Sequence, residues 1–379
     1  MLLKISLVDR KRFVTFADRH PYRNFLQYPS WADLKTEMRW SSELLGWYSQ
    51  DAHMVGATVV LYRKVPGINK YLAYIPRGPL IDWFSQDYKL EDWFTPLFAH
   101  LKNRHVFSVK MDPPLIKRTW SSHSIKEGIF EYQTHGIKNK RLTDLVSDTT
   151  FNSVEFIQQE LSEMGWHQNA VVDSFDSVQP QYVFRLRLSG KSLDDLFSEF
   201  DPIWQKKINQ AEWEGVEVRI GTEQDFDDFY HLLAHTAQQE QTQARESTYF
   251  EKMFRTLRQE GPERIRLYLA VQDKQLLAAC LAIHVKGHTE ELYSAKLGKS
   301  DHPASYLLRW KMIADSYERG DQMYDFRGVS TTLNDKDPLF EMLRFRLGYA
   351  GDVCELMGEW DYPVIPMLHW AFDMYMKKR

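Results

Sequence analysis

The sequence predicts a mixed α/β (α+β) fold made of two similar modules. Three observations support this prediction. Strand-like and helix-like segments alternate along 379 residues, a length that suits two or three domains. Two apolar runs around a polar break at 51–53 are typical of a β-hairpin, and the same pattern recurs around a break at 273–275. The alternative to a duplication is a chance match between two ordinary hairpins.

The first module is expected to begin with a helix. Ser30 is a typical helix N-cap, so this helix should start at Trp31. The elements expected after it are strands 44–50, 55–63 and 70–75, a turn at Arg77-Gly78-Pro79, a helix over 91–103 and a strand over 106–111.

The second module repeats this order with its own flanking elements. The expected elements are a strand over 179–188, a basic helix over 196–214, strands 265–272, 276–285 and 291–295, a helix over 304–319 and a strand over 323–326. Pro303 and Gly320 favour these helix ends, because proline suits a first turn and glycine suits the residue after the last turn. The order resembles the core of the acyl-CoA N-acyltransferase (GNAT) fold.

Composition excludes several classes of protein. With 43% hydrophobic and 14% aromatic residues, the chain is globular and not disordered. Its longest apolar run, near 276–285, is too short to cross a bilayer, and its first residues do not resemble a signal peptide. Cys280 and Cys354 lack disulfide or zinc spacing, which favours a reducing, cytoplasmic compartment. A net charge of −4 argues against a broad nucleic-acid-binding surface, although it allows a local basic cleft.

The common metal and cofactor motifs are absent. The sequence has no GxxxxGK[ST] phosphate loop, no HExxH metal motif and no GxSxG nucleophile elbow. Segment 298–303, before the second long helix, also lacks the glycine-lined loop that would hold the pyrophosphate of acyl-CoA. We therefore expect no metal and no cofactor, although the fold suggests acyl transfer.

Several blocks, in order along the chain, resemble the FemABX family of tRNA-dependent aminoacyltransferases that build peptidoglycan branches. The blocks are Phe25-Leu26-Gln27 with Trp31 and Lys35; Arg77 to Asp82; Val109 to Pro113; Arg245 with Tyr249-Phe250; Tyr324 to Ser330; and Arg344 to Tyr349, continuing to Gly358-Glu359-Trp360. Together they cover nearly the whole chain. Some family members carry a coiled-coil arm, but here segment 255–264 leads directly into a strand. The chain therefore resembles the armless, FemX-like members.

The resemblance implies a tandem duplication of GNAT-like domains, the first of residues 1–179 plus 358–379 and the second of residues 180–357. It also implies transfer of an amino acid from aminoacyl-tRNA to the side-chain amine of the third residue of the stem peptide. The acceptor would be UDP-MurNAc-pentapeptide or lipid II, and the product the interpeptide branch. Two alternatives stay open: acyl-CoA-dependent N-acylation of a small amine, and non-catalytic binding of tRNA or precursor.

Five residues are predicted to bind the acceptor. The resemblance puts Lys35 at its phosphates, where a compact cation suits a diphosphate. Arg245 and Tyr249 are four residues apart, so on a helix they share one face, and an arginine fork binds phosphate. Gln243 would add a polar contact, and Tyr293 would line the same site. Ordinary surface or core positions are the alternatives.

Three further residues are predicted to lie near the reacting ester. In the resembled family a Phe-Lys pair lies beside the 3′ end of the tRNA, and Phe345 and Arg346 match it here. A fixed cation stabilises the oxyanion of a tetrahedral intermediate, and an aromatic ring stacks on the terminal adenine. Arg346 keeps the charge of the usual lysine but cannot act as a neutral amine. Asp112, at a strand end, would accept a proton from the attacking amine or cap a turn.

Charged segments elsewhere give two weaker predictions. Lys206 and Lys207 are candidate tRNA contacts, with a solvated helix face as the alternative. Segment 365–379 is amphipathic and ends in Lys377-Lys378-Arg379. Peripheral contact with the inner face of the membrane is one interpretation of this segment, and packing on the first domain is the favoured one.

Overall fold

A computed structural model describes residues 3–136, 140–169, 178–239, 245–298 and 302–376 of the chain. The chain forms two compact units: unit 1 comprises Met1–Arg118, Thr149–Gln181 and Glu355–Arg379, and unit 2 comprises Thr119–Asp148 and Tyr182–Cys354. The domains predicted from the sequence, 1–179 plus 358–379 and 180–357, differ from these units mainly in residues 119–148, which belong to unit 2. Strands β6 (Ile116–Ser121) and β15 (Asp352–Leu356) carry the chain from one unit to the other.

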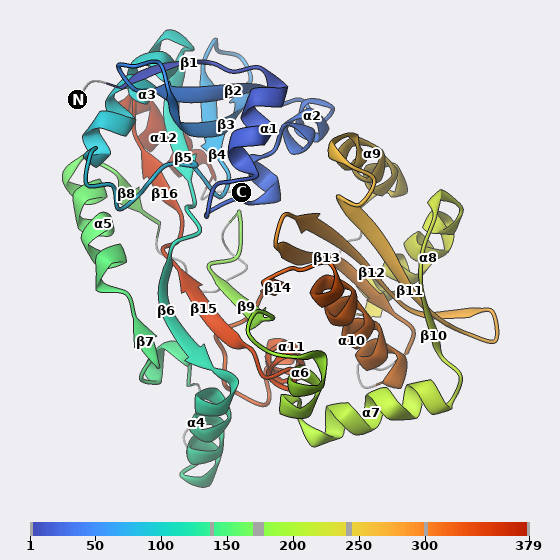
Figure 1. Cartoon of the computed structure of the whole chain (residues 1–379). Coiled ribbons are helices and arrows are strands. Elements are labelled where there is room, and N and C mark those ends of the chain that lie inside the picture. The colour runs from blue at the N-terminus through green and yellow to red at the C-terminus, as the bar shows by residue number, and fades with distance from the viewer. Residues whose placement is uncertain (1–2, 137–139, 170–177, 240–244, 299–301, 377–379) are drawn as a thin grey trace. The chain divides into compact units, whose positions relative to one another are not determined.

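Unit 1 contains a sheet of strand order β1-β2-β3-β4-β5-β16-β8 among its described residues (Figure 1). Its elements are β1 (Lys4–Leu7), α1 (Arg10–Ala17), α2 (Pro29–Thr36), β2 (Ser41–Tyr48), β3 (Met54–Lys64), β4 (Tyr71–Ile75), α3 (Leu90–Asn103), β5 (Val106–Met111), β7 (Thr149–Thr150), α5 (Asn152–Glu163), β8 (His167–Gln168), β16 (Trp360–Tyr362) and α12 (Pro366–Met376). The predicted hairpin is β2 and β3, and β4 pairs in parallel with β5.

Helix α3 supplies much of the core of unit 1. Its Trp93, Leu97 and Leu101 recur at helical spacing and are buried against the sheet, where Val60 belongs to the same cluster. The indole N–H of Trp47 donates a 2.7 Å hydrogen bond to the carbonyl oxygen of Trp93. Full burial of each such side chain stabilises the fold by roughly 2 kcal/mol, so this face fixes the helix on the sheet.

Helix α2 begins earlier than the sequence predicted. Pro29 occupies the first turn, where the missing N–H of proline costs nothing, and Tyr28 precedes it in an extended conformation. Ser30 is buried inside the helix, so its prediction as the N-cap was wrong.

Unit 2 contains most of the second sheet, whose strand order is β10-β11-β12-β13-β14-β9-β15-β6-β7 among the described residues. Its further elements are α4 (Ser122–Thr134), β9 (Tyr182–Arg187), α6 (Leu193–Glu199), α7 (Pro202–Trp213), β10 (Glu217–Ile220), α8 (Phe226–Gln239), α9 (Ser247–Leu257), β11 (Ile265–Gln272), β12 (Gln275–Val285), β13 (His288–Lys296), α10 (Pro303–Glu318), β14 (Met323–Gly328) and α11 (Pro338–Leu347). Helix α10 packs on β11 and β12 and against α7 (Figure 1).

The predicted basic helix over 196–214 is two helices, α6 and α7. Pro202 breaks it, because a proline removes a backbone donor and disfavours helical geometry in the residue before it. Asp201 then caps the new helix by accepting a hydrogen bond of 3.0 Å from the N–H of Ile203. The predicted end of α10 is confirmed, since Gly320 follows the C-cap with a φ of 79°, a conformation that glycine adopts without strain.

Both units share one order of elements. In unit 1 the hairpin β2-β3 leads to β4, then α3, then β5 in parallel with β4; in unit 2 the hairpin β11-β12 leads to β13, then α10, then β14 in parallel with β13. The described residues hold no coiled-coil arm, because α9 ends at Leu257 and β11 begins at Ile265. No helix in the described ranges is long and apolar enough to cross a membrane.

Candidate active site

The candidate active site lies in unit 2, where the parallel strands β13 and β14 separate (Figure 1). The two strands pair only as far as Glu290 and Asp325. Beyond this point β13 continues beside β12 and β14 beside β9, and each strand carries a register shift. Bulges redirect side chains and are frequent next to active sites. Polar side chains from both strands collect here.

A buried carboxylate, Glu291 on β13, is the centre of this cluster. Its Oε1 accepts a 2.9 Å hydrogen bond from the hydroxyl of Tyr324, and its Oε2 lies 3.6 Å from the guanidinium of Arg309 on α10. Burial acts to lower the pKa of Arg309, but the Glu291 carboxylate, together with smaller effects of Cys280, Tyr349 and Tyr324, raises it overall. Arg309 is therefore a permanent cation held by Glu291.

Arg346, near the end of α11, is the second cation of the cluster. Its guanidinium donates a hydrogen bond to the carbonyl oxygen of Gly328, at the end of β14. Burial lowers the pKa of Arg346 to about 10; Glu291 opposes this effect, and the positive charge of Arg309 adds to it. Arg346 is still protonated at neutral pH, so it presents a fixed positive charge at the separation of the strands.

The ring of Phe345 packs inside an aromatic group. Its centroid lies 5.0 Å from the ring centroid of Tyr306, 5.5 Å from that of Tyr349 and 6.2 Å from that of Trp204. The Arg309 guanidinium lies 5.1 Å from the Phe345 ring centroid. The Trp204 indole N–H also donates a 2.9 Å hydrogen bond to the Phe345 carbonyl oxygen. These contacts fix the last turn of α11, and with it the position of the next residue, Arg346.

Arg327 on β14 connects this cluster with the predicted acceptor residues. Its φ of 64° is unusual for a residue with a side chain and coincides with the register shift in β14. The carboxylate of Asp325 accepts a 2.6 Å hydrogen bond from the Arg327 N–H, and the Arg327 side chain lies 3.2 Å from Glu290. The charge of Arg327 lowers the pKa of Arg346 and acts in the same direction on Tyr249, so it reaches both groups.

The structure brings together three of the predicted acceptor residues. The hydroxyls of Tyr293 on β13 and Tyr249 on α9 lie 3.5 Å apart, and the Arg245 guanidinium lies 4.9 Å from the Tyr249 ring centroid. Burial, followed by the proximity of Tyr293, raises the pKa of Tyr249, so its hydroxyl keeps its proton at neutral pH. Gln243 lies outside the described residues.

The charges around the strand separation do not cancel. Among the described residues here, four arginines face three carboxylates: the arginines are Arg185, Arg309, Arg327 and Arg346, and the carboxylates are Glu290, Glu291 and Asp325. One positive charge is left over in a partly buried environment, where charges interact more strongly than in water. Such a surplus suits an oxyanion or another small anion.

The predicted tRNA contacts, Lys206 and Lys207, lie on α7. The Lys207 ammonium lies 5.9 Å from the ring centroid of Tyr306, and Lys206 is exposed. Lys206 shares its exposed face of α7 with Trp213, a side chain 88% exposed. The two lysines therefore have different surroundings.

Lys35 lies in unit 1, on α2. Its ammonium is 4.5 Å from the ring centroid of Trp31, one turn earlier on the same helix. A cation over an indole ring keeps a defined position while remaining half-exposed.

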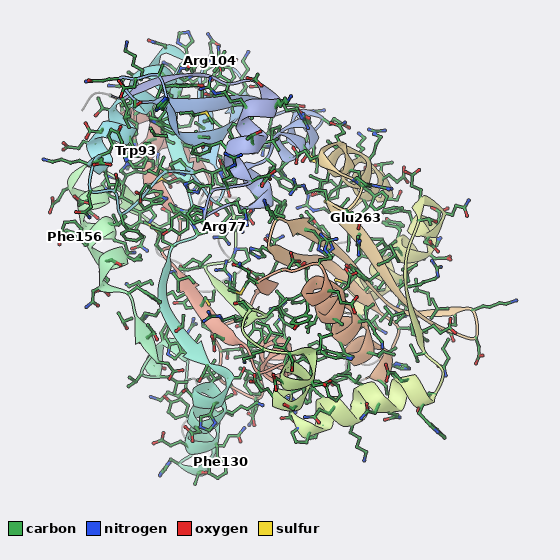
Figure 2. The ribbon with its side chains drawn as sticks, in the orientation of Figure 1. Arg77, Trp93, Arg104, Phe130, Phe156 and Glu263 are labelled. Atoms are coloured by element: carbon green, nitrogen blue, oxygen red, sulfur yellow. The ribbon has the colours of Figure 1, made fainter. Side chains whose placement is uncertain are left out.

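Asp112, at the end of β5, is buried in unit 1 with only 2% of its surface exposed. Its carboxylate accepts hydrogen bonds of 3.1 Å from the Tyr74 hydroxyl and 3.0 Å from the N–H of Arg77, whose guanidinium lies 3.6 Å away (Figure 2). Burial raises the pKa of Asp112 to about 6, although Arg77 acts in the opposite direction. These contacts are those of a carboxylate that fixes the turn after β4.

Sequence reasoning missed Glu291, Arg309 and Arg327. The signal was present: Glu291 lies in a predicted strand, and Arg309 shares a predicted helix with the apolar Trp310 and Ile313. Charged residues are almost never buried without a partner, so a charge in an expected core position is itself a signal. Among the described residues, no group of three or more His, Cys, Asp or Glu side chains could hold a metal ion.

Solved structures define the class to which this fold belongs. The crystal structure of FemX superposes with a TM-score of 0.80 at 17% identity, over 97% of this chain and 99% of that one. A tandem GNAT protein from the clavulanic acid biosynthesis pathway gives a TM-score of 0.50 at 11% identity, over 96% and 98%. The predicted tandem GNAT-like fold is confirmed.

Sequence comparison defines the family. A model of the FemAB family matches residues 8–271 and 255–378. The aminoacyltransferase FemA of Staphylococcus epidermidis is 22% identical in an alignment of 426 positions that covers 96% of each chain. FemA of Staphylococcus aureus (strain MRSA252) is 19% identical in an alignment of 443 positions that covers 99% of each chain. The chain belongs to the FemAB family, as the sequence blocks predicted, and it is an aminoacyltransferase.

Proposed function

We propose that the enzyme transfers an amino acid from aminoacyl-tRNA to the side-chain amine of the third residue of the peptidoglycan stem peptide. The acceptor is UDP-MurNAc-pentapeptide or lipid II, which share this peptide, and the product is the first part of an interpeptide branch. The observation that carries the proposal is the fixed cation Arg346, held beside Glu291 and Arg309 in a chain of the FemAB family. We place the reaction in the cytoplasm.

The chemistry needs little more than positioning and charge. The ester of aminoacyl-tRNA is already activated, and the neutral amine attacks its carbonyl carbon, so a C–N bond forms. The C–O bond to the tRNA then breaks, and the proton lost by the amine goes to the 3′-oxygen that leaves. Between these two steps, negative charge develops on the carbonyl oxygen. A guanidinium that is already in place stabilises this charge without reorganisation.

Arg346 supplies this charge, and its surroundings keep it in place. The hydrogen bond to the Gly328 carbonyl oxygen and the packing of Phe345 fix the guanidinium. A pKa of about 10 makes Arg346 a cation at neutral pH, so it is not the group that accepts the proton. Tyr249 and Tyr293, with Arg245, form the acceptor side of the site, and the charge of Arg327 acts on both Tyr249 and Arg346.

Four other predicted residues take different parts in the proposal. Lys206 on the exposed face of α7 is retained as a tRNA contact, and so is Lys207, whose ammonium lies near the Tyr306 ring. Lys35 is retained as a contact of the acceptor phosphates. Asp112 is assigned a structural role, because its carboxylate is buried and its Oδ1 accepts hydrogen bonds from the Tyr74 hydroxyl and the Arg77 N–H.

A transfer assay tests the proposal. The purified enzyme is mixed with aminoacylated bacterial tRNA and either UDP-MurNAc-pentapeptide or lipid II, and the acceptor is weighed by mass spectrometry. We expect the acceptor to gain the mass of one amino-acid residue, and RNase treatment of the tRNA to abolish this gain. A gain that requires an acyl-CoA and persists after RNase would instead establish the acyl-CoA-dependent alternative, and saturable binding without any gain would establish a binding protein.

A further inference from the structure

Helix α12 of unit 1 presents two faces of different character. Its inner face is fixed to β5: the His369 ring and the Ser108 hydroxyl share a 2.8 Å hydrogen bond, and the rings of Phe372 and Phe107 lie 5.4 Å apart in an edge-to-face contact. The N–H of Ile365, just before the helix, also donates a 2.9 Å hydrogen bond to the Phe107 carbonyl oxygen. This face accounts for the predicted packing of the segment on the first domain.

The outer face of α12 is apolar and exposed. Met367, Trp370 and Met374 are 80%, 63% and 41% exposed, and their spacing of three and four residues puts them on one line along the helix. Ala371, also exposed, lies on the same line. Large apolar side chains scattered singly are normal on a surface, but a line of them on one helix face indicates a surface that binds something.

The charges near this face favour an anionic occupant. Residues 366–376 contain one acidic residue, Asp373, and its carboxylate lies 3.3 Å from the His369 ring. The sequence continues with Lys377, Lys378 and Arg379. These three residues lie outside the described part of the chain, and only their place in the sequence bears on the occupant. An apolar helix face followed in the sequence by cations is a combination that binds the interface of anionic phospholipids, where tryptophan is also enriched.

The size of the face argues against a second copy of the chain. An 11-residue helix is roughly 16 Å long, and three large side chains cover on the order of a few hundred Å². A stable protein interface buries about 1,200–2,000 Å² in total. A bilayer needs no such area or shape complementarity, because the side chains enter the acyl-chain boundary directly.

We infer that α12 docks the enzyme on an anionic phospholipid surface, with Met367, Trp370 and Met374 inserted at the headgroup boundary. The inference does not depend on the proposed transfer reaction. It predicts a peripheral contact through one helix face, which brings the enzyme to the surface where a lipid-linked acceptor would lie.

Vesicle sedimentation tests the inference. The full chain is mixed, without tRNA or acceptor, with vesicles of phosphatidylcholine that contain or lack phosphatidylglycerol. We expect binding to the anionic vesicles that weakens as salt is added, and we expect Trp370→Ser to weaken it about tenfold, the effect of losing about 1.4 kcal/mol. Phe156→Ser is the matched control, because Phe156 on α5 is another aromatic of unit 1 and is 60% exposed (Figure 2).

The outcomes separate this inference from its alternatives. Equal binding of wild type and Trp370→Ser, or equal loss in both variants, would overturn it. The inference would also be overturned if the wild type bound neither kind of vesicle. This holds even if the wild type formed a dimer that Trp370→Ser disrupts. Transfer to UDP-MurNAc-pentapeptide should be unchanged in Trp370→Ser, so a failed transfer assay and a failed vesicle assay remain distinguishable.

Discussion

At the scale of single residues, Arg346 carries the proposed chemistry, and its neighbour Arg344 provides a natural control. Both lie on α11, but Arg344 is exposed and forms a 2.7 Å ion pair with Glu341 on the same helix. Exposed pairs of this kind contribute little to stability. Comparing the two arginines therefore separates the loss of the buried cation from the general loss of an arginine on this helix.

We expect Arg346→Ala to lower the rate of transfer by about a hundredfold or more, the usual effect of removing one oxyanion-stabilising donor. Arg344→Ala should stay near the wild-type rate. Arg346→Lys keeps the positive charge and should recover part of the lost rate, although a lysine lacks the fork that bonds to the Gly328 carbonyl oxygen. Single-turnover transfer measures all three. Equal rates for the two alanine variants would rule out the role assigned to Arg346.

Asp112 gives the second residue-scale prediction. If its carboxylate fixes a turn instead of taking a proton from substrate, Asp112→Asn should transfer within about threefold of wild type, because the amide keeps most of the size and hydrogen bonds. A general base would lose far more, since such groups contribute about a hundredfold or more. A loss of that size in a folded Asp112→Asn variant would return Asp112 to the catalytic site.

The pH dependence of stability tests the same residue independently. The pKa of Asp112 is raised from 3.8 to about 6 in the folded state, so its contribution to stability is present below pH 3.8 and is lost as the pH rises through about 6. The two-unit shift corresponds to about 3 kcal/mol. Urea unfolding between these values should show this fall in the wild type and a flatter profile in Asp112→Asn.

At the scale of elements, β13 carries residues of both the cation cluster and the acceptor group. Its buried Glu291 is the residue whose loss should destabilise the fold most directly. Replacing Glu291 by glutamine leaves Arg309 without its buried counter-charge, which should lower the free energy of unfolding by about 3 kcal/mol. Glu263→Gln is the matched control, because Glu263, labelled in Figure 2, is 56% exposed, unlike the buried Glu291. Its effect should stay below about 1 kcal/mol; similar effects of the two changes in urea unfolding would contradict the buried role of Glu291.

The contact between α9 and β13 makes a different prediction. Tyr249→Phe removes the hydroxyl that lies 3.5 Å from Tyr293 but keeps the ring beneath Arg245. We expect the KM for the acceptor to rise by up to about tenfold with little change in kcat, because one hydrogen bond to bound substrate is lost. Tyr230→Phe on α8 is the control. A fall in kcat at constant KM would place Tyr249 at the reacting atoms instead.

The elements also show how far the sequence was informative. Local sequence patterns correctly predicted the two hairpins, the strands 106–111 and 265–272 and the end of α10. Apolar periodicity, proline and glycine act within a few residues, so a single sequence records them. The break at Pro202 was overlooked, although the signal was local. The Glu291–Arg309 pair was out of reach, since it depends on which strand α10 packs against.

The candidate site residues were also only partly predictable, because their neighbours depend on the fold. The expectation that Arg245 and Tyr249 share a helix face was wrong, because Arg245 precedes α9, which begins at Ser247. The Arg245 guanidinium still lies over the Tyr249 ring, and the fold brings Tyr293 beside Tyr249. The unusual φ of Arg327 lies just after β14 separates from β13, at a register shift against β9, and no local pattern records this. Asp112 was correctly placed at a strand end, yet its burial and its three partners became visible only in the structure.

At the scale of the whole molecule, two GNAT-like modules occupy one chain, and their corresponding parallel strands end differently. In unit 1 the strands β4 and β5 lead to Arg77 and Asp112, whose contacts hold a turn. In unit 2 the strands β13 and β14 lead to a cluster with surplus positive charge. The proposed transfer reaction belongs to this cluster of unit 2, and one measurement on the product tests whether that reaction occurs.

That measurement is fragmentation of the transfer product in the mass spectrometer. The account predicts one additional amino-acid residue, joined through an amide bond to the side-chain amine of the third stem-peptide residue, and formed only when intact aminoacyl-tRNA is present. An added residue at another position, or the same product formed with RNase-treated tRNA and an acyl-CoA, would contradict it.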